Sequence, residues 1–213
     1  MKRLYVFGDS FTDPNIISNN KSYIKWKGYT PKTFHEIISE RLNLEVVNFA
    51  KSFGMDNYTI FQELCNNINA LDDSIVIINW GETTRFRMVD SSTRKWRTIL
   101  HSNSMRTMKG LPFVNGVSDD AIREIFDNRK DKLWVTEVNS WINLINKALS
   151  NSTVVYWTWC CEDKRESITE ETNGEVVDFH YSENGHRQLA EWILTQIENG
   201  GYLKSPYINK SLL

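Results

Sequence analysis

The sequence lacks the features that would point to a membrane or to nucleic acid. None of its apolar runs approaches the ~20 residues of a membrane-spanning helix. The stretch before Gly8, Leu4 to Phe7, is too short for the apolar part of a signal peptide. The formal net charge is −2, so the composition gives no sign of a basic surface for phosphates. We expect a soluble, cytoplasmic protein with no nucleic-acid and no membrane partner.

Cysteine is also scarce. The chain has three, Cys65 and the adjacent Cys160 and Cys161, with no spacing that suits a metal site. The odd count favours a reduced compartment, in which these thiols act as small apolar side chains rather than as a vicinal redox pair. We expect no metal and no cofactor.

The overall composition is that of an ordinary globular protein. Hydrophobic residues make up 40% and charged residues 24% of the 213 residues. A chain of this length can fill one core, and it contains no repeat and no linker-like stretch. We therefore expect a single domain over residues 1–213.

Short apolar runs alternate with segments of helical spacing. The runs that predict buried strands are residues 2–8, 44–49, 74–80 and 153–159. The segments with apolar residues at helical spacing are residues 31–43, 57–70, 132–149 and 183–198. Strands that are apolar throughout and separated by helices are typical of a parallel sheet covered on both faces. The predicted fold class is α/β, a three-layer α/β/α sandwich.

Residues 86–130 interrupt this rhythm. The segment is polar and contains Gly110, Pro112 and Gly116, and Ser118 is placed to cap a short helix. We interpret it as an insertion that forms part of the substrate wall.

Chemically useful residues follow the predicted strands. In open parallel α/β sheets, ligands bind beyond the carboxyl ends of the strands. Ser10 follows the first strand in YVFGDSFTD, and Asp178 and His180 in VVDFHYSENGH lead into the last helix, whose start lies at the same edge. A serine hydroxyl becomes a nucleophile when an imidazole accepts its proton, and imidazole titrates near pH ~6.5. Because residues i and i+2 of an extended segment point to one side, Asp178 can orient His180.

The segments YVFGDSFTD and DFHYSENGH resemble the first and last blocks of the SGNH hydrolases, also called the GDSL esterase/lipase family. The resemblance runs in order from residue 5 to about residue 192, although most identical residues lie in these two blocks. It implies a flavodoxin-like fold, Ser10 as the nucleophile, and Asp178 and His180 as acid and base. It further implies that the backbone N–H groups of Ser10 and Gly54 stabilise the oxyanion, where one donor is typically worth ~10² to 10³ in rate.

Two departures from the family pattern stand out. The third block of the family, Gly-x-Asn-Asp, is replaced by NWGETTR. Alignment on Gly81 puts Thr83 at the oxyanion position of the Asn, whereas alignment on Asn79 puts Gly81 there, and neither residue supplies a side-chain amide. In addition, Asp178 precedes the histidine by two residues rather than three.

Some aromatic, arginine and histidine residues are candidates for binding substrate, and others are expected to have only structural roles. Trp80 ends a strand at the active edge and is a candidate for substrate binding, since aromatic faces stack on sugars. Arg85 is a candidate for an anionic substrate, although exposed arginines are commonly just solvated. His186, in the first turn of the last helix, is expected to cap or pack, and His35 to lie on the surface.

The resulting prediction is a serine esterase or deacylase that hydrolyses a carboxylic ester, for example O-acetyl on a carbohydrate, through an acyl-serine intermediate. Its partner is a small-molecule or carbohydrate ester, and the oligomeric state stays open. The alternatives are an acyltransferase, a non-catalytic or weakly active binding member of the same fold, and metal-dependent phosphoester hydrolysis. The last would use Asp9, Asp178, His180 and His186.

Overall fold

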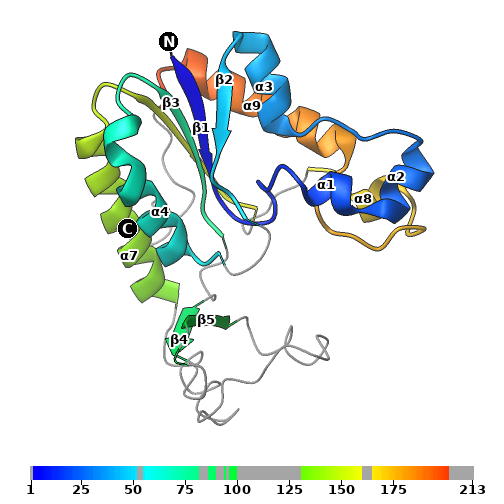
Figure 1. Cartoon of the computed structure of the whole chain (residues 1–213), viewed down its shortest axis with the longest axis horizontal. Helices are drawn as coiled ribbons and strands as arrows, with labels where there is room; N and C mark the ends of the chain where they lie inside the picture. The colour runs from blue at the N-terminus through cyan, green and yellow to red at the C-terminus, as the bar shows by residue number, and fades with distance from the viewer. Residues whose placement is uncertain are drawn as a thin grey trace.

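The centre of the molecule is a four-stranded parallel sheet (Figure 1). A computed structural model describes residues 2–51, 55–81, 86–89, 94, 96–99, 131–159 and 165–201, with the backbone alone for 86–89, 96–99 and 131–134. The strands are β1 (Arg3–Phe7), β2 (Glu45–Asn48), β3 (Ile75–Asn79) and β6 (Thr153–Trp157), in the order β2-β1-β3-β6. The prediction of an α/β fold with a parallel sheet is confirmed.

The order of the strands creates a switch point beside β1. The chain passes from β1 to β2 on one side and then returns to β3 on the other side of β1. Leu4 of β1 is accordingly paired with Val46 of β2 and with Ile75 of β3. Ile77 of β3 is in turn paired with Val155 of β6. Crevices for ligands form at the carboxyl ends of such strands. Residues that directly follow β1 and β3 are therefore well placed for a site.

Helices cover both faces of the sheet, as predicted. In Figure 1, α4 (Asn57–Asn67) and α7 (Asp131–Ala148) lie on one face, and α3 (Phe34–Leu42) and α9 (Glu183–Glu198) on the other. A short 3₁₀ turn, η1 (Ile68–Ala70), follows α4. Within the described ranges, no helix has both the length and the apolar character needed to cross a membrane.

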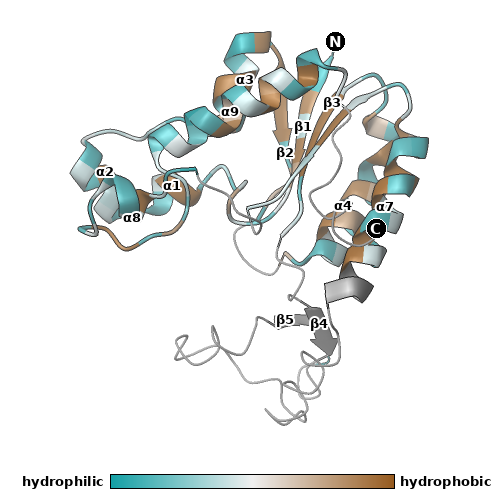
Figure 2. Ribbon diagram, turned by 180° about the vertical axis from the view of Figure 1, so that it is seen from behind, coloured by the Kyte–Doolittle hydropathy of each residue, from teal (hydrophilic) through white to brown (hydrophobic). Residues whose placement is uncertain are grey.

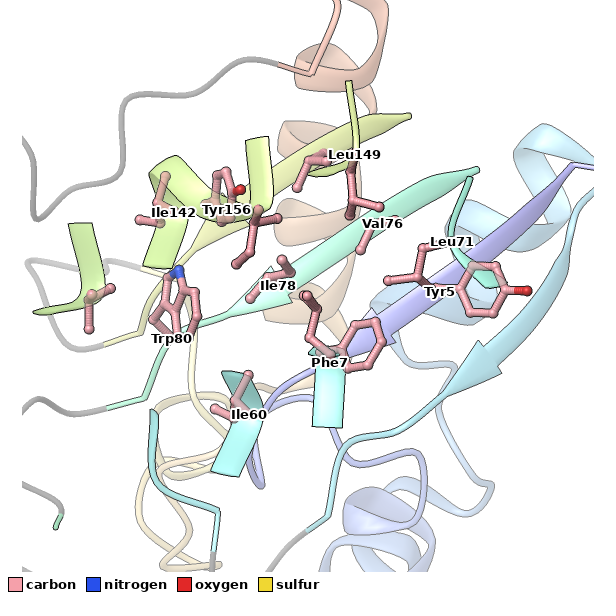
Figure 3. Close-up of a cluster of buried hydrophobic side chains, with 14 of the residues drawn as sticks. Tyr5, Phe7, Ile60, Leu71, Val76, Ile78, Trp80, Ile142, Leu149 and Tyr156 are labelled. Atoms are coloured by element: carbon pink, nitrogen blue, oxygen red, sulfur yellow. The ribbon is translucent and has the colours of Figure 1, made fainter. Parts of the chain in front are cut away.

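Alternation along the strands divides the core into two layers. Tyr5 and Phe7 of β1 pack with α4 and α7, whereas Leu4 and Val6 pack with α3 and α9. The first layer is shown in Figure 3, where Phe7 lies close to the residues of β3. In Figure 2 the strands β1, β2 and β3 are largely hydrophobic, and the helices carry both hydrophobic and hydrophilic residues. This is the pattern of a sheet buried on both faces.

Several short elements were not predicted. Helices α1 (Ile16–Asn19), α2 (Lys21–Lys27) and α8 (Ile168–Glu171) lie together beside the sheet in Figure 1. They share a small apolar cluster made of Ile17, Tyr23, Ile168 and Val176. Strands β4 (Phe86–Val89) and β5 (Trp96–Ile99) form an antiparallel pair at the start of the predicted insertion. The rest of that insertion, with the helix predicted from Ser118, lies outside the described residues.

Two histidines are buried between α3 and α9. His35 is only 3% exposed and His186 1%, so the prediction that His35 lies on the surface is wrong. The backbone N–H of Phe34 donates to His186 Nδ1 at 3.3 Å. Burial lowers the pKa of His35 to about 4. Burial, with smaller effects of His35 and His180, lowers the pKa of His186 to about 3.

These two histidines should make the protein less stable in mild acid. An unfolded histidine takes up its proton near pH ~6.5, before either buried imidazole does. Their contribution to the free energy of unfolding is therefore complete above pH ~6.5 and falls as the pH drops towards 4, by roughly 3 kcal/mol for each. In urea titrations between pH 7 and pH 4, the free energy of unfolding of His186→Asn should fall clearly less with decreasing pH than that of the unmodified protein. Asn keeps an acceptor for Phe34 N–H and cannot be protonated, so equal slopes would contradict this account.

Candidate active site

Ser10 lies in a tight turn directly after β1. The backbone carbonyl of Asp9 accepts from the N–H groups of Thr12 at 2.9 Å and Asp13 at 3.1 Å, which closes the turn around Ser10. Gly8 is required by close packing, since a Cβ there would lie 2.5 Å from Thr12 Oγ1 and 2.8 Å from Asn79 Cβ. The Gly-Asp-Ser sequence thus brings the end of β1 against the end of β3 and leaves the partly buried Ser10 at the edge of the sheet.

The buried carboxylate of Asp9 joins the ends of three strands. Its Oδ1 accepts from Phe11 N–H at 3.1 Å and from Asn79 Nδ2 at 2.8 Å. Its Oδ2 accepts from Trp159 Nε1 at 2.9 Å. Asn79 also donates to Thr12 Oγ1 at 3.0 Å. Asp9 therefore fixes the turn that carries Ser10 to the last residue of β3 and to a residue that follows β6.

The structure brings Asp178 and His180 into direct contact. Asp178 Oδ1 lies 2.7 Å from His180 Nδ1 and also accepts from the backbone N–H of His180 at 2.9 Å. An ionised carboxylate can only accept, so Nδ1 carries the proton and Nε2 is left as the acceptor.

A short antiparallel pairing holds this segment extended. The N–H of Ile168 donates to the carbonyl of His180, and the N–H of Thr169 to that of Asp178, both at 2.9 Å. Thr169 Oγ1 also accepts from the N–H of Asp178 at 2.7 Å. The pairing needs Gly185, where a Cβ would lie 2.2 Å from the carbonyl oxygen of Glu166. Pairing with the start of α8 therefore places the side chains of Asp178 and His180 on the same side of the segment.

The carboxylate of Asp178 is held in its charged form. Burial by itself would raise the pKa of this group. The hydrogen bonds from the ring and the backbone of His180, the charge of that ring and a hydrogen bond from Asn20 together lower the pKa below its ordinary value. At neutral pH the carboxylate is thus ready to stabilise an imidazolium.

The second ring nitrogen of His180, Nε2, is buried. Nε2 has no hydrogen-bond partner in the described part of the chain. The ring packs against Phe11, the residue directly after Ser10, with 4.7 Å between ring centroids. Phe11 in turn stacks on Trp159 at 4.5 Å. The ring of His180 thus lies against the turn that carries Ser10, although no hydrogen bond joins Ser10 Oγ to His180 among the described residues.

The remaining predicted residues divide into two groups. Gly54, Thr83 and Arg85 lie outside the described residues. Trp80 is fully buried, packs near Ile78 and Ile60 in Figure 3, and contacts Trp141 with 6.0 Å between ring centroids. A role of Trp80 in binding substrate stays a prediction, and its burial is that of a core residue.

Sequence reasoning missed Asn20 and the ring of Phe11. Asn20 Nδ2 donates to Asp178 Oδ2 at 2.5 Å across 158 residues of sequence. Its only local signal is that Asn is a common helix N-cap, which says nothing of Asp178. Phe11 could have been suspected from its place next to Ser10.

Over the described ranges, no three or more His, Cys, Asp and Glu side chains are grouped so that they could hold a metal ion. The carboxylates of Asp9 and Asp178 instead accept hydrogen bonds from protein donors.

Comparisons with known proteins give a distant structural likeness. No family model matches the chain, and no curated protein sequence matches it. Among solved structures, an acetyl xylan esterase from the rumen bacterium Butyrivibrio proteoclasticus is similar with a TM-score of 0.46 and 10% sequence identity. The match covers 94% of this chain and 65% of that one. At this identity and TM-score the likeness does not bear on activity.

Replacing Asp9 by Asn should destabilise the turn that carries Ser10. The Asn side chain presents one oxygen and one amino group to Phe11 N–H, Asn79 Nδ2 and Trp159 Nε1, all of which now donate to the carboxylate of Asp9. At least one buried donor then loses its partner, and the free energy of unfolding should fall by about 1–3 kcal/mol in urea titrations. The matched control is Asp72→Asn on the surface, where the side chain of Asp72 accepts from Asn151 Nδ2 at 3.3 Å. Equal stability of the two variants would contradict a structural role of Asp9.

Proposed function

We propose that this chain is a serine esterase or deacylase of the SGNH type, which hydrolyses a carboxylic ester through an acyl-serine intermediate. The observation that carries the proposal is the buried, unused Nε2 of His180, with Nδ1 held by Asp178 and the ring packed beside the Ser10 turn. A buried acceptor without a partner is costly and calls for an explanation. A hydroxyl that donates to Nε2 during the reaction supplies one.

The proposed reaction begins with Ser10. As Oγ attacks the carbonyl carbon of the ester, its proton passes to His180 Nε2, and the Asp178 carboxylate stabilises the imidazolium. The tetrahedral intermediate then collapses, and Nε2 returns the proton to the departing alcohol. A water molecule attacks the acyl-serine in the same way, which releases the acid and restores Ser10.

The negative oxygen of the intermediate needs hydrogen-bond donors. Among the described residues, neither the backbone N–H nor the hydroxyl of Ser10 makes a hydrogen bond, so this N–H is a free donor beside the nucleophile. We propose Gly54 and Thr83 as the other members of the oxyanion hole.

The reaction requires Ser10 Oγ to come within hydrogen-bond reach of Nε2. Such contacts are often long without substrate and shorten in the complex. Ser10 is partly exposed at the edge of the sheet. An O-acetyl group on a carbohydrate is the substrate that we propose, with Arg85 contacting it, whereas the fully buried Trp80 is set aside as a contact. An acceptor alcohol in place of water would make the same site an acyltransferase.

Hydrolysis of p-nitrophenyl acetate tests the proposal. Ser10→Ala and His180→Ala should each lower kcat/KM by roughly 10³-fold or more, because neither the nucleophile nor its base can be replaced by a neighbour. Asp178→Ala should also lower the rate while the fold is kept. The matched control is Ser18→Ala, in which an exposed serine that donates to Asn15 O at 3.1 Å is removed.

The control should keep the rate of the unmodified protein. Turnover that survives in the folded Ser10→Ala variant would refute the acyl-serine mechanism. A folded chain with no turnover of any acyl ester would instead favour a binding protein of the same fold.

A further inference from the structure

Both ends of the Asn20 amide are occupied, and this fixes its orientation. Its Oδ1 accepts from the backbone N–H of Tyr23 at 2.9 Å, as the N-cap of α2. The oxygen must face that donor, so the amino group must point away from it. That amino group donates to Asp178 Oδ2 at 2.5 Å.

The carboxylate of Asp178 is thereby held at both oxygens. Oδ1 accepts from the ring and the backbone of His180, and Oδ2 accepts from Asn20. The terminal torsion of an aspartate is broad when only one oxygen is bound. With both bound, the plane of the carboxylate is fixed, and with it the direction of the hydrogen bond to Nδ1. The donor on Oδ2 also helps to keep the carboxylate charged.

Helix α2, whose N-cap is Asn20, is anchored on both sides of the Asp178–His180 segment. Lys27 Nζ lies 2.6 Å from Glu171 Oε1 and 3.0 Å from Glu183 Oε2. Glu171 precedes that segment and Glu183 follows it. The hydroxyl of Tyr23 donates to Glu171 and accepts from the N–H of Glu183 at 3.0 Å. The amide of Asn20 is therefore presented from a fixed helix.

We propose that Asn20 is a positioning residue for the proposed esterase reaction, acting through Asp178 to set the orientation of the His180 ring. The inference rests on the proposed function. It gives a role in the reaction to the residue between α1 and α2, which lies far from Asp178 in sequence. Asn20 itself does not touch the reacting atoms.

The variants Asn20→Ser and Asn20→Asp separate this role from helix capping. Ser and Asp cap helices as well as Asn does, so α2 should keep its stability in both. The hydroxyl of Ser is too short to donate to Asp178, and Asp places a second carboxylate against it. The matched control is Asn15→Asp at the N-cap of α1, where the side chain makes no capping hydrogen bond.

With p-nitrophenyl acetate, Asn20→Ser should lower kcat by roughly 10- to 100-fold and leave KM within about twofold, by analogy with residues that orient a metal-bound imidazole from behind. Asn20→Asp should lower kcat further and move the acidic limb of the pH–rate profile to higher pH, because a second carboxylate favours the protonated imidazole. Asn15→Asp should match the unmodified protein. An Asn20→Ser variant with unchanged kcat would overturn the proposal.

A second readout does not need turnover. The Nδ1–H of His180 should give a downfield proton resonance in the unmodified protein, and Asn20→Ser should shift it upfield or broaden it, whereas Asn15→Asp should not. If the chain has no esterase activity, this measurement alone tests the positioning, so the two failures can be told apart. No resonance in the unmodified protein, or an unchanged one in Asn20→Ser, would overturn the proposal.

Discussion

The candidate site depends on the hydrogen bond between Asp178 Oδ1 and His180 Nδ1, at 2.7 Å. This bond decides which ring nitrogen carries the proton, and it leaves Nε2 as the acceptor. Without it the imidazole would be one more half-buried ring against Phe11. With it the ring has a defined tautomer and direction beside the turn that carries Ser10, as the proposed base requires. The proposed chemistry follows from that difference.

The rest of the architecture brings this pair and Ser10 to one edge of the sheet. Ser10 reaches that edge because β1 lies at the switch point of the strand order, and the buried carboxylate of Asp9 fixes its turn to the end of β3 and to Trp159 after β6. His180 reaches the same edge from the other end of the chain, just before α9 begins at Glu183. Two distant segments are thus held in place by separate sets of hydrogen bonds.

The sequence predicted the sheet and its four covering helices well, because long apolar runs and helical spacing report directly on burial. The spacing of Asp178 and His180 likewise placed both side chains on one side of an extended segment. Helices α1, α2 and α8 were not predicted, because they are only four to seven residues long. They are held by contacts between residues far apart in sequence, such as Lys27 with Glu171. The contact of Asn20 with Asp178 could not be predicted either, since no local sequence pattern indicates it.

The most direct test of the central claim is labelling by a fluorophosphonate probe, with the modified residue located by peptide mapping. The probe reacts with a serine only when a base activates the hydroxyl. The account predicts that Ser10 is labelled in the unmodified protein and that His180→Ala abolishes the label while the fold is retained. Labelling at another serine, or labelling of Ser10 that persists without His180, would contradict it.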